Sequence, residues 1–257
     1  METTTTRRQA VWMLGALGGA TIAAAANTAT RADPIRAVAF DAFAIFDPRP
    51  VFGACEALFP GRGTDLAATW RTRLFEYQWL RALGGRYVDF EATAAAALDF
   101  AATTSKLRLS PEQRSTLLAG FQQLQAWPDV AASLAALKSR GLTIALLSNA
   151  TPRMLGAGLK LSNLEAAFDE VISTDRARTF KPDPRAYRLG VELLRERKSS
   201  IAFVAFAGWD AAGARWFGYP TFWNNRMAMP EENLDGMADA SGASLDALVR
   251  WLVARSV

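Results

Sequence analysis

The alternation of apolar and helical segments constrains the fold of this chain more than any other feature. From Pro34 onward, short apolar runs alternate with longer stretches that have the spacing of helices. Short runs without polar positions are typical of strands buried on both faces of a parallel sheet. The predicted strands are residues 37–40, 142–147, 170–173, 201–206 and 220–223. The sequence therefore predicts an α/β fold with a doubly wound parallel sheet, a Rossmann-like core.

Helices are predicted around these strands. They fill residues 130–140, 153–160, 184–197, 211–217 and 245–253. Gly141 directly follows the first of them and fits the C-cap position, where glycine is favoured because it adopts a positive φ without steric cost. Helices of this kind return the chain to the start of the next strand, as parallel pairing requires.

One long stretch breaks the alternation. Residues 51–125, between the first two predicted strands, contain no convincing strand. Helical spacing recurs instead at residues 66–83, 90–103 and 111–124. Ligands of doubly wound sheets bind at the carboxyl ends of the strands, so a helical block inserted there would close over the ligand. We therefore predict a cap of residues 51–125 on a core of residues 33–50 and 126–257.

Residues 1–32 have the features of an export signal. Arg7 and Arg8 precede an apolar run, rich in alanine and glycine, that extends to Ala26 and is too short and too weakly hydrophobic to span a bilayer comfortably. Paired arginines before such a run resemble a twin-arginine signal, which a receptor reads. Small residues suit cleavage after Ala26 or Ala32. The interpretation predicts a periplasmic protein that meets the twin-arginine export machinery in transit. An uncleaved or disordered N-terminus is the alternative.

Composition excludes several kinds of catalysis. The chain contains no histidine and a single cysteine, Cys55, which lies among apolar residues. Triads that need histidine, histidine-ligated metal sites and intramolecular disulfides are therefore excluded. The formal charge of +4 becomes close to neutral once the three arginines of the leader are removed. No basic run is present, so no nucleic-acid partner is expected. Catalysis must use carboxylates, Lys, Arg, Ser or Asn.

Polar side chains follow four of the predicted strands or lie in the loops beyond them. Asp41 directly follows the first strand, and Ser148 with Asn149 directly follows the second. Lys181 lies in the sequence Phe-Lys-Pro-Asp, and Asp210 lies four residues beyond the strand of residues 201–206. Since the carboxyl ends of parallel strands meet at one edge of a sheet, we expect these groups to converge in a cleft.

The order of these groups resembles the four motifs of the haloacid dehalogenase superfamily, and most closely those of the L-2-haloacid dehalogenase family. The similarity extends over nearly the whole chain after the leader. The matching segments are Trp70-Arg71, Glu76-Tyr77, Trp79-Leu80-Arg81, Arg86-Tyr87, Leu147-Ser148-Asn149, Lys181-Pro182-Asp183 with Tyr187, and Trp209-Asp210-Ala211 with Gly213-Ala214-Arg215.

The resemblance implies a hydrolase that removes halide from (S)-2-haloacids and yields (R)-2-hydroxyacids. It makes Asp41 the nucleophile, which displaces halide with inversion and forms an ester that water then hydrolyses. Arg71 would bind the substrate and take up the departing halide. Lys181 would orient Asp41, and Asp210 would position Lys181 or the hydrolytic water. Splitting the displacement into two steps is the general advantage of covalent catalysis.

The resemblance also implies how a small halogenated carboxylic acid is held. Its carboxylate would bind to Ser148, Asn149 and the backbone amides of Ala42 and Phe43. Three further side chains, Tyr187, Phe90 and Trp209, would complete the substrate site. The family resemblance implies neither a metal ion nor an organic cofactor, and it implies a homodimer.

The sequence also departs from that pattern. Residues 41–47 form a nucleophile loop that is one residue shorter than the family's and lacks its threonine, and residues 205–208 replace a serine and an asparagine with apolar residues. A protein that binds small carboxylates but turns over weakly is therefore an alternative, and leaving groups including fluoride stay open. A phosphatase is the other alternative, in which Asp210 would hold magnesium. Phe43 argues against it, because superfamily phosphatases place a general acid there and an aromatic ring cannot donate that proton.

Overall fold

The computed structural model describes residues 33–255 of the 257-residue chain. The predicted leader lies outside the described residues. The described residues form one compact unit. No helix in the described part of the chain is both long enough and apolar enough to cross a membrane.

Six parallel strands form the sheet, in the order β3-β2-β1-β4-β5-β6. Their bounds are β1 Ala37–Phe40, β2 Thr143–Ser148, β3 Glu170–Ser173, β4 Ile201–Ala205, β5 Thr221–Asn224 and β6 Ala240–Gly242. The strand order reverses at β1, which pairs with β2 on one side and β4 on the other. The predicted doubly wound sheet is confirmed, and β6 is an addition. Its sequence, Ala-Ser-Gly, has no apolar run that could have predicted it.

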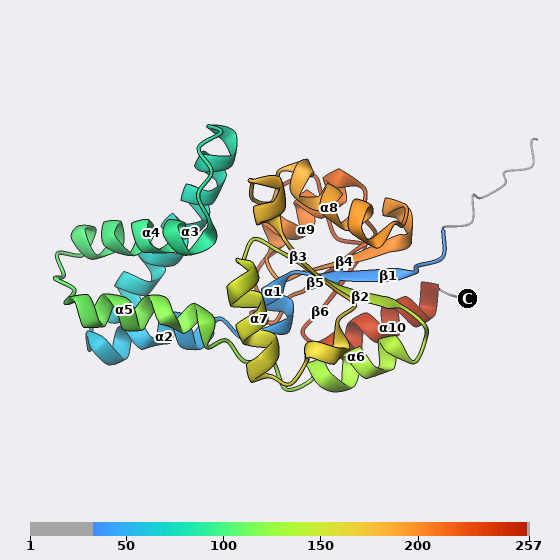
Figure 1. The fold of residues 1–257 in the computed structure, drawn as a ribbon, viewed down its shortest axis with the longest axis horizontal. Helices are drawn as coiled ribbons and strands as arrows, with labels where there is room; N and C mark the ends of the chain where they lie inside the picture. The colour runs from blue at the N-terminus through green and yellow to red at the C-terminus, as the bar shows by residue number, and fades with distance from the viewer. Residues whose placement is uncertain (1–32, 256–257) are drawn as a thin grey trace, which may run out of the picture. The chain divides into compact units, whose positions relative to one another are not determined.

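Helices cover both faces of the sheet (Figure 1). The core helices are α6 Val130–Lys138, α7 Pro152–Leu161, α8 Pro184–Leu194, α9 Gly208–Phe217 and α10 Leu245–Arg255. Successive strand residues point to opposite faces. Val38 and Phe40 of β1 therefore join a core that contains residues of α6, α7 and α10, whereas Ala37 and Ala39 join the core beneath α8 and α9. Short 3-10 turns η2 Glu165–Ala167, η3 Thr174–Ala177 and η4 Lys198–Ser200 complete the core.

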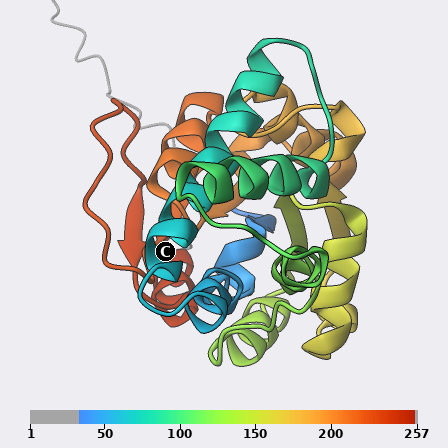
Figure 2. The same cartoon turned by 90° about the vertical axis from the view of Figure 1, so that its left-hand side faces the viewer.

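Helices also form the segment between β1 and β2. It contains α1 Ala42–Ile45, α2 Arg49–Leu58, α3 Gly63–Leu83, α4 Phe90–Thr104, α5 Pro111–Ala119 and the 3-10 turn η1 Gly120–Gln122. From α2 onward these helices lie at the end of the sheet where the strands finish, as Figures 1 and 2 show. Trp70 and Phe121 pack edge to face in their interior, with ring centroids 5.6 Å apart.

Two details of this segment differ from the prediction. Helix α2 was not predicted, and the helix predicted over residues 111–124 ends at Ala119, where η1 begins. The change from α5 to η1 occurs at Gly120, which lies against Val51 of α2. The division of the chain into cap and core at residues 51 and 125 stays a prediction.

Predictions for two single residues are confirmed. Cys55 is fully buried, and burial raises the pKa of its thiol to about 11. The thiol therefore stays protonated at neutral pH and packs as a small apolar group. Gly141 follows α6 with a φ of +73°, as a glycine C-cap requires.

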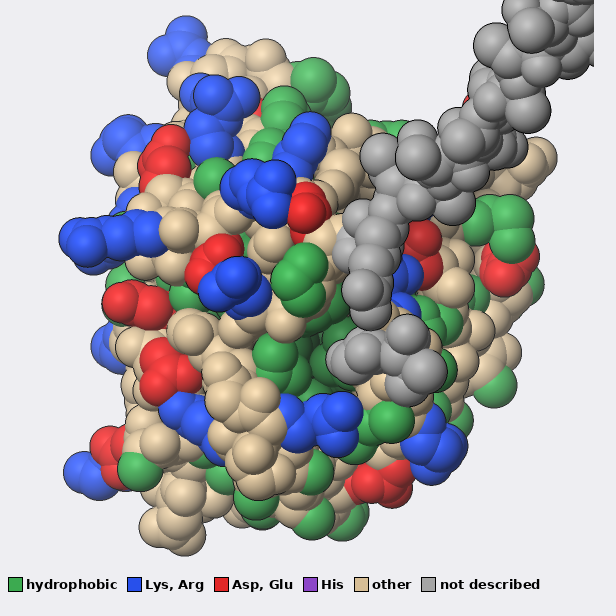
Figure 3. Space-filling model, turned by 90° about the vertical axis from the view of Figure 1, so that its right-hand side faces the viewer, with side chains coloured by type: hydrophobic (Ala, Val, Ile, Leu, Met, Phe, Trp, Pro, Cys, Tyr) green, Lys and Arg blue, Asp and Glu red, His purple; other side chains and the backbone are tan. Residues whose placement is uncertain are grey.

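The face at which the strands begin lies opposite the cap. Basic and acidic side chains are interspersed on it (Figure 3). The polar groups that follow the strands lie at the other end of the sheet, so this face takes no part in the site described next.

Candidate active site

Asp41 is held where β1 ends. Its backbone N–H donates to the carbonyl oxygen of Val204 on the neighbouring strand at 2.9 Å. The side chain caps helix α1, because Oδ2 accepts a hydrogen bond from the Phe43 N–H at 3.0 Å. The carboxylate is thus fixed in direction, yet 13% of the side chain remains exposed. One part of the carboxylate therefore stays open for a reaction.

Lys181 connects Asp41 to a second carboxylate. Its Nζ lies 2.8 Å from Asp41 Oδ1 and 2.6 Å from Asp210 Oδ2, and both Lys181 and Asp210 are almost completely buried. Burial alone would lower the pKa of Lys181, but Asp210 and Asp41 outweigh it and raise that pKa. The ammonium therefore stays charged and neutralises one of its two carboxylates.

The pKa of Asp210 is raised, since burial penalises its charged form more strongly than Lys181 favours it. Tyr187 supplies a further hydrogen bond, with its hydroxyl 2.7 Å from Asp210 Oδ1. Burial also raises the pKa of Tyr187, so the phenol stays protonated and donates. Tyr187 was predicted to bind the substrate. The structure instead buries it fully and engages its hydroxyl with Asp210, so its influence on a substrate passes through that carboxylate.

Ser148 and Asn149 lie at the end of β2, as predicted, but the protein itself uses their side chains. Ser148 Oγ accepts from the Ala150 N–H at 3.1 Å. Asn149 Oδ1 accepts from the Lys181 N–H at 2.9 Å, and its Nδ2 donates to Gln78 Oε1 on α3 at 2.8 Å. The asparagine therefore links the loop of Lys181 to the cap. Of the Asn149 amide, only the second N–H of its NH2 group remains able to donate a hydrogen bond to a substrate.

Two of the predicted site residues, Arg71 and Phe90, belong to the cap. Arg71 is exposed on α3 and makes no hydrogen bond or ion pair within residues 33–255; its predicted role stays a prediction. Phe90 is buried inside the cap against Phe121, at 5.1 Å between ring centroids. It is thus a packing residue of the cap, and its predicted contact with a substrate stays a prediction.

Aromatic rings join the cap to the core beside the site. Trp209, which precedes Asp210, lies 5.6 Å from the ring of Phe75 and 5.4 Å from that of Trp79. The hydroxyl of Tyr87, on the cap, donates a hydrogen bond to Asp175 of the core, which lies six residues before Lys181 in the sequence. Trp209 therefore lies at the cap–core contact and supplies an apolar wall beside Asp210; its predicted contact with a substrate stays a prediction.

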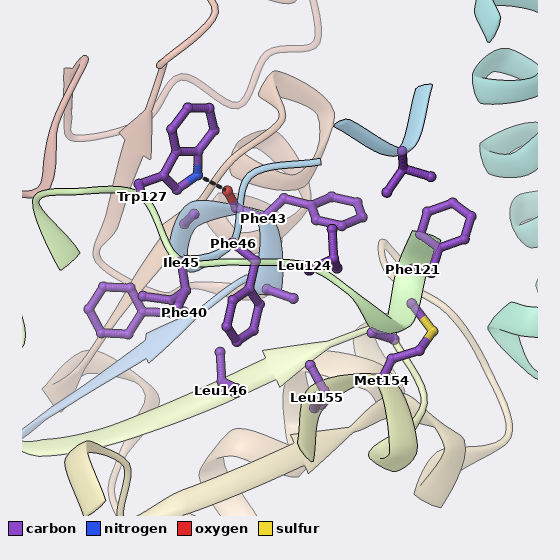
Figure 4. Close-up of a cluster of buried hydrophobic side chains, with 14 of the residues drawn as sticks. Phe40, Phe43, Ile45, Phe46, Phe121, Leu124, Trp127, Leu146, Met154 and Leu155 are labelled. Atoms are coloured by element: carbon purple, nitrogen blue, oxygen red, sulfur yellow. Dashed lines mark hydrogen bonds between the residues drawn. The ribbon is translucent and has the colours of Figure 1, made fainter. Parts of the chain in front are cut away.

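The shortened nucleophile loop has support that the sequence did not reveal. Helix α1 is fully buried, and Trp127 satisfies two of its carbonyl groups. The Trp127 backbone N–H donates to Ile45 O at 3.0 Å, and its indole Nε1–H donates to Phe43 O at 3.0 Å (Figure 4). No motif around Trp127 indicates this role, because the contact joins residues 84 positions apart.

Arg226 completes this support. Its guanidinium forms an ion pair with Asp129 at 2.9 Å and lies 4.8 Å from the ring centroid of Trp127. Asp129 also accepts the Leu245 N–H at 2.7 Å. Trp127 is therefore held in place by Arg226, whose Nη2 also donates to Ala44 O of α1 at 3.4 Å.

The environment above Asp41 is poor in hydroxyl groups. The rings of Phe43 and Phe206 meet edge to face, with centroids 6.1 Å apart, and Ala205 is fully buried. This arrangement defines a capped α/β fold in which a partly exposed carboxylate lies at the point where the strand order reverses, beside a buried ammonium and a second carboxylate.

Comparison with known proteins agrees with that class. The haloacid dehalogenase-like hydrolase family matches residues 18–218. An (S)-2-haloacid dehalogenase of Pseudomonas sp. (strain YL) is 40% identical over 218 residues, which cover 84% of this chain and 94% of that protein. Haloacetate dehalogenase H-2 of Moraxella sp. (strain B) is 37% identical over 219 residues, 85% of this chain and 98% of that protein.

Solved structures show the same relationship. A crystal structure of an L-2-haloacid dehalogenase has a TM-score of 0.84 at 36% identity and covers 86% of this chain and all of that one. L-2-haloacid dehalogenase from Xanthobacter autotrophicus with chloropropionic acid covalently bound has a TM-score of 0.79 at 33% identity, covering 85% and 98%. The chain belongs to the haloacid dehalogenase-like hydrolase family, and both of these solved structures are of L-2-haloacid dehalogenases.

Proposed function

We propose that this protein hydrolyses (S)-2-haloacids to (R)-2-hydroxyacids and halide. The observation that carries the proposal is the ion group at the strand ends, in which Lys181 holds Asp41 at 2.8 Å and Asp210 at 2.6 Å. The group leaves Asp41 fixed in direction and partly open. Relatives at 33–40% identity that are named (S)-2-haloacid dehalogenases supply the substrate class.

In the first step, an oxygen of Asp41 attacks carbon 2 of the substrate from the side opposite the halogen. The carbon–halogen bond breaks, halide leaves with the bonding electrons, and an ester forms with inverted configuration. Apolar walls from Phe43, Phe206 and Trp209 leave the carboxylate poorly hydrated, which favours attack. Arg71, on the cap, is proposed to bind the departing halide after the cap helix has moved closer to Asp41.

In the second step, water adds to the carbonyl carbon of the Asp41 ester. The tetrahedral intermediate collapses, the hydroxyacid leaves, and the carboxylate is restored. Asp210 is the group positioned to accept the proton of that water, since its raised pKa makes it a better base than an ordinary carboxylate. The halide freed in the first step and the proton taken from water in the second are both released, which balances the overall hydrolysis.

A phosphatase can share this fold, but it needs a general acid that this site lacks. The structure of a phosphatase of this superfamily from Thermococcus onnurineus is similar, with a TM-score of 0.55 at 24% identity, which shows the fold alone. Phe43 occupies the position where a phosphatase requires a general acid, and its ring packs on Phe206. The site therefore favours displacement of halide over transfer of a phosphoryl group.

A single turnover in heavy-oxygen water tests the proposal. With enzyme in excess over a 2-halocarboxylate, label should enter Asp41 first and appear in the hydroxyacid only in later turnovers. Asp41→Asn should release no halide. Label that appears directly in the product would show attack by water instead. Magnesium-dependent release of phosphate from simple phosphoesters would select the phosphatase.

We also propose that residues 1–32 direct export to the periplasm by the twin-arginine route, and that the mature protein is a homodimer. The support for export is the pair Arg7-Arg8 before an alanine-rich and glycine-rich run. Changing both arginines to lysine should leave the uncleaved protein in the cytoplasm, and equal periplasmic recovery would contradict export. Sedimentation of the mature protein tests the dimer.

A further inference from the structure

Gln78 is a fully buried amide that the reaction described above does not use. It lies on α3 and is 0% exposed. Its neighbours on the helix, Phe75 and Trp79, both pack against Trp209 of the core. The amide group of Gln78 therefore lies where the cap meets the end of the sheet, next to the residue that precedes Asp210.

The orientation of the Gln78 amide follows from its partners. The backbone N–H of Lys181 can only donate, so the Asn149 atom that it contacts at 2.9 Å must be the oxygen, Oδ1. Asn149 therefore presents its NH2 group to Gln78, and the Gln78 atom that accepts it at 2.8 Å must be Oε1. The remaining atom of the Gln78 amide is thus its donor, Nε2.

That donor has no acceptor. Gln78 Nε2 is buried and finds no hydrogen-bond partner within residues 33–255. Trp79, the next residue, has a second buried donor in the same condition, its indole Nε1. Leaving a buried N–H group unpaired is unfavourable, so such groups in native proteins call for an explanation. Two of them adjacent on the cap helix, at the cap–core contact, point to an acceptor that arrives with a ligand.

We propose that Gln78 Nε2 donates a hydrogen bond to an anionic group of the substrate, either its carboxylate or the departing halide. This inference rests on the proposed function and adds a substrate contact to it. The acceptor on Gln78 is already committed to Asn149, so its donor has a fixed direction. An uncharged donor in an apolar setting binds an anion without forming an ion pair with Asp41 or Asp210, which a buried arginine at this position would do.

The test compares two substitutions that separate donation from packing. Gln78→Glu keeps an oxygen that accepts from Asn149 but replaces the donor with a negatively charged oxygen. Gln78→Met removes both polar atoms and keeps the length of the side chain. Gln123→Glu, on the exposed surface of the cap, is the control for adding one negative charge and should leave kcat/KM unchanged.

A substrate donor predicts that kcat/KM for halide release at pH 8 falls about 10- to 100-fold in both variants, the range for losing a hydrogen bond to a charged group. Gln78→Glu should be at least as impaired as Gln78→Met. If Gln78 only ties the cap to Asn149, Gln78→Met lowers the free energy of unfolding but keeps the wild-type kcat/KM of the folded enzyme, and the inference is wrong. Unchanged kcat/KM in both variants also overturns it.

A series of leaving groups identifies the anion. If the acceptor is the carboxylate, kcat/KM falls equally for 2-chloro-, 2-bromo- and 2-iodopropanoate. If the acceptor is the halide, the loss is largest for chloride, whose charge is the most concentrated, and smallest for iodide. Either result supports donation by Gln78 and assigns its target.

A binding measurement separates this inference from the proposed catalysis. In Asp41→Asn, which cannot form the ester, calorimetry with 2-chloropropanoate should give a Kd about 10-fold or more weaker once Gln78→Glu is added. That result supports the inference even if the wild-type protein releases no halide. Equal Kd values with and without Gln78→Glu, or no binding by Asp41→Asn alone, overturn it.

Discussion

Replacing Lys181 with methionine tests how far the ion group at the strand ends stabilises the protein. The Lys181 ammonium lies 2.8 Å from Asp41 Oδ1 and 2.6 Å from Asp210 Oδ2. Methionine keeps the apolar stem but removes the ammonium, which also lies 5.0 Å from the ring centroid of Phe203, and so leaves two carboxylates without their cation. Removing one partner of a buried ion pair costs about 3–5 kcal/mol of the free energy of unfolding. Because one ammonium serves two carboxylates here, we expect about 4–5 kcal/mol at pH 8.

The loss should become smaller as the pH falls. Burial raises the pKa of Asp210 in the folded protein, and Lys181 opposes that rise, so the pKa rises further in the variant. A raised folded-state pKa means that the folded protein binds this proton more tightly than the unfolded chain does. The resulting stability is present below the unfolded pKa of about 3.9 and is lost as the pH rises through the folded pKa. Relative to the wild type, whose Asp210 pKa is also raised, the variant should regain up to about 1.4 kcal/mol per pH unit between the folded-state pKa of the wild type and the higher one of the variant.

Urea unfolding followed by tryptophan fluorescence from pH 5 to pH 8 measures both effects. Lys138→Met is the matched control, because Lys138 pairs with Asp169 at a partly exposed position. Its loss should be about 0–1 kcal/mol, as for other surface pairs, and nearly independent of pH in this range. A loss below about 1 kcal/mol for Lys181→Met, or one that does not change between pH 5 and pH 8, would refute the reasoning.

Three further outcomes are expected. Asp210→Asn should keep a burst of about one equivalent of halide per enzyme and slow the steady rate about 100-fold, since only ester hydrolysis needs the base; loss of the burst in stopped-flow halide detection would contradict this. Trp127→Phe removes the donor to Phe43 O and should lower both kcat and the free energy of unfolding, the latter by about 1 kcal/mol. An unchanged urea midpoint and an unchanged kcat would show that this hydrogen bond does not support the loop. The acid limb of kcat should lie above the ordinary aspartate pKa of about 3.9, because the pKa of Asp210 is raised; a limb at the ordinary value would show that another group controls it.

The sequence predicted the sheet and the ion group because both depend on local patterns. Apolar runs identified five of the six strands, and their carboxyl ends must meet at one edge when the strands are parallel. Asp41, Lys181 and Asp210 were therefore expected together before any distance was known. Strand β6 was missed because its three residues are not apolar as a run, and its place comes from pairing with β5.

Contacts between distant segments were beyond the same reasoning. The predicted substrate residue Tyr187 is engaged with Asp210 instead, and Asn149 is divided between Lys181 and Gln78. Neither outcome follows from a strand ending or a helical spacing. A side chain that ends a strand can bind a ligand or bind the protein, and only the three-dimensional partners of its donor and acceptor atoms decide which.

The contacts that hold the nucleophile loop bear on which of the two proposed steps limits turnover. Trp127 hydrogen-bonds to α1 and is held by Arg226, so Asp41 is fixed in direction although its loop lacks the family's threonine. These contacts satisfy carbonyl groups of α1 and present nothing to water above Asp41. Phe206 and Ala205 add no hydroxyl group there either. In the proposed reaction, alkylation of Asp41 therefore has a carboxylate that is held in direction, whereas hydrolysis of the ester would depend on Asp210 and Lys181. Ester hydrolysis is thus the step that should limit turnover.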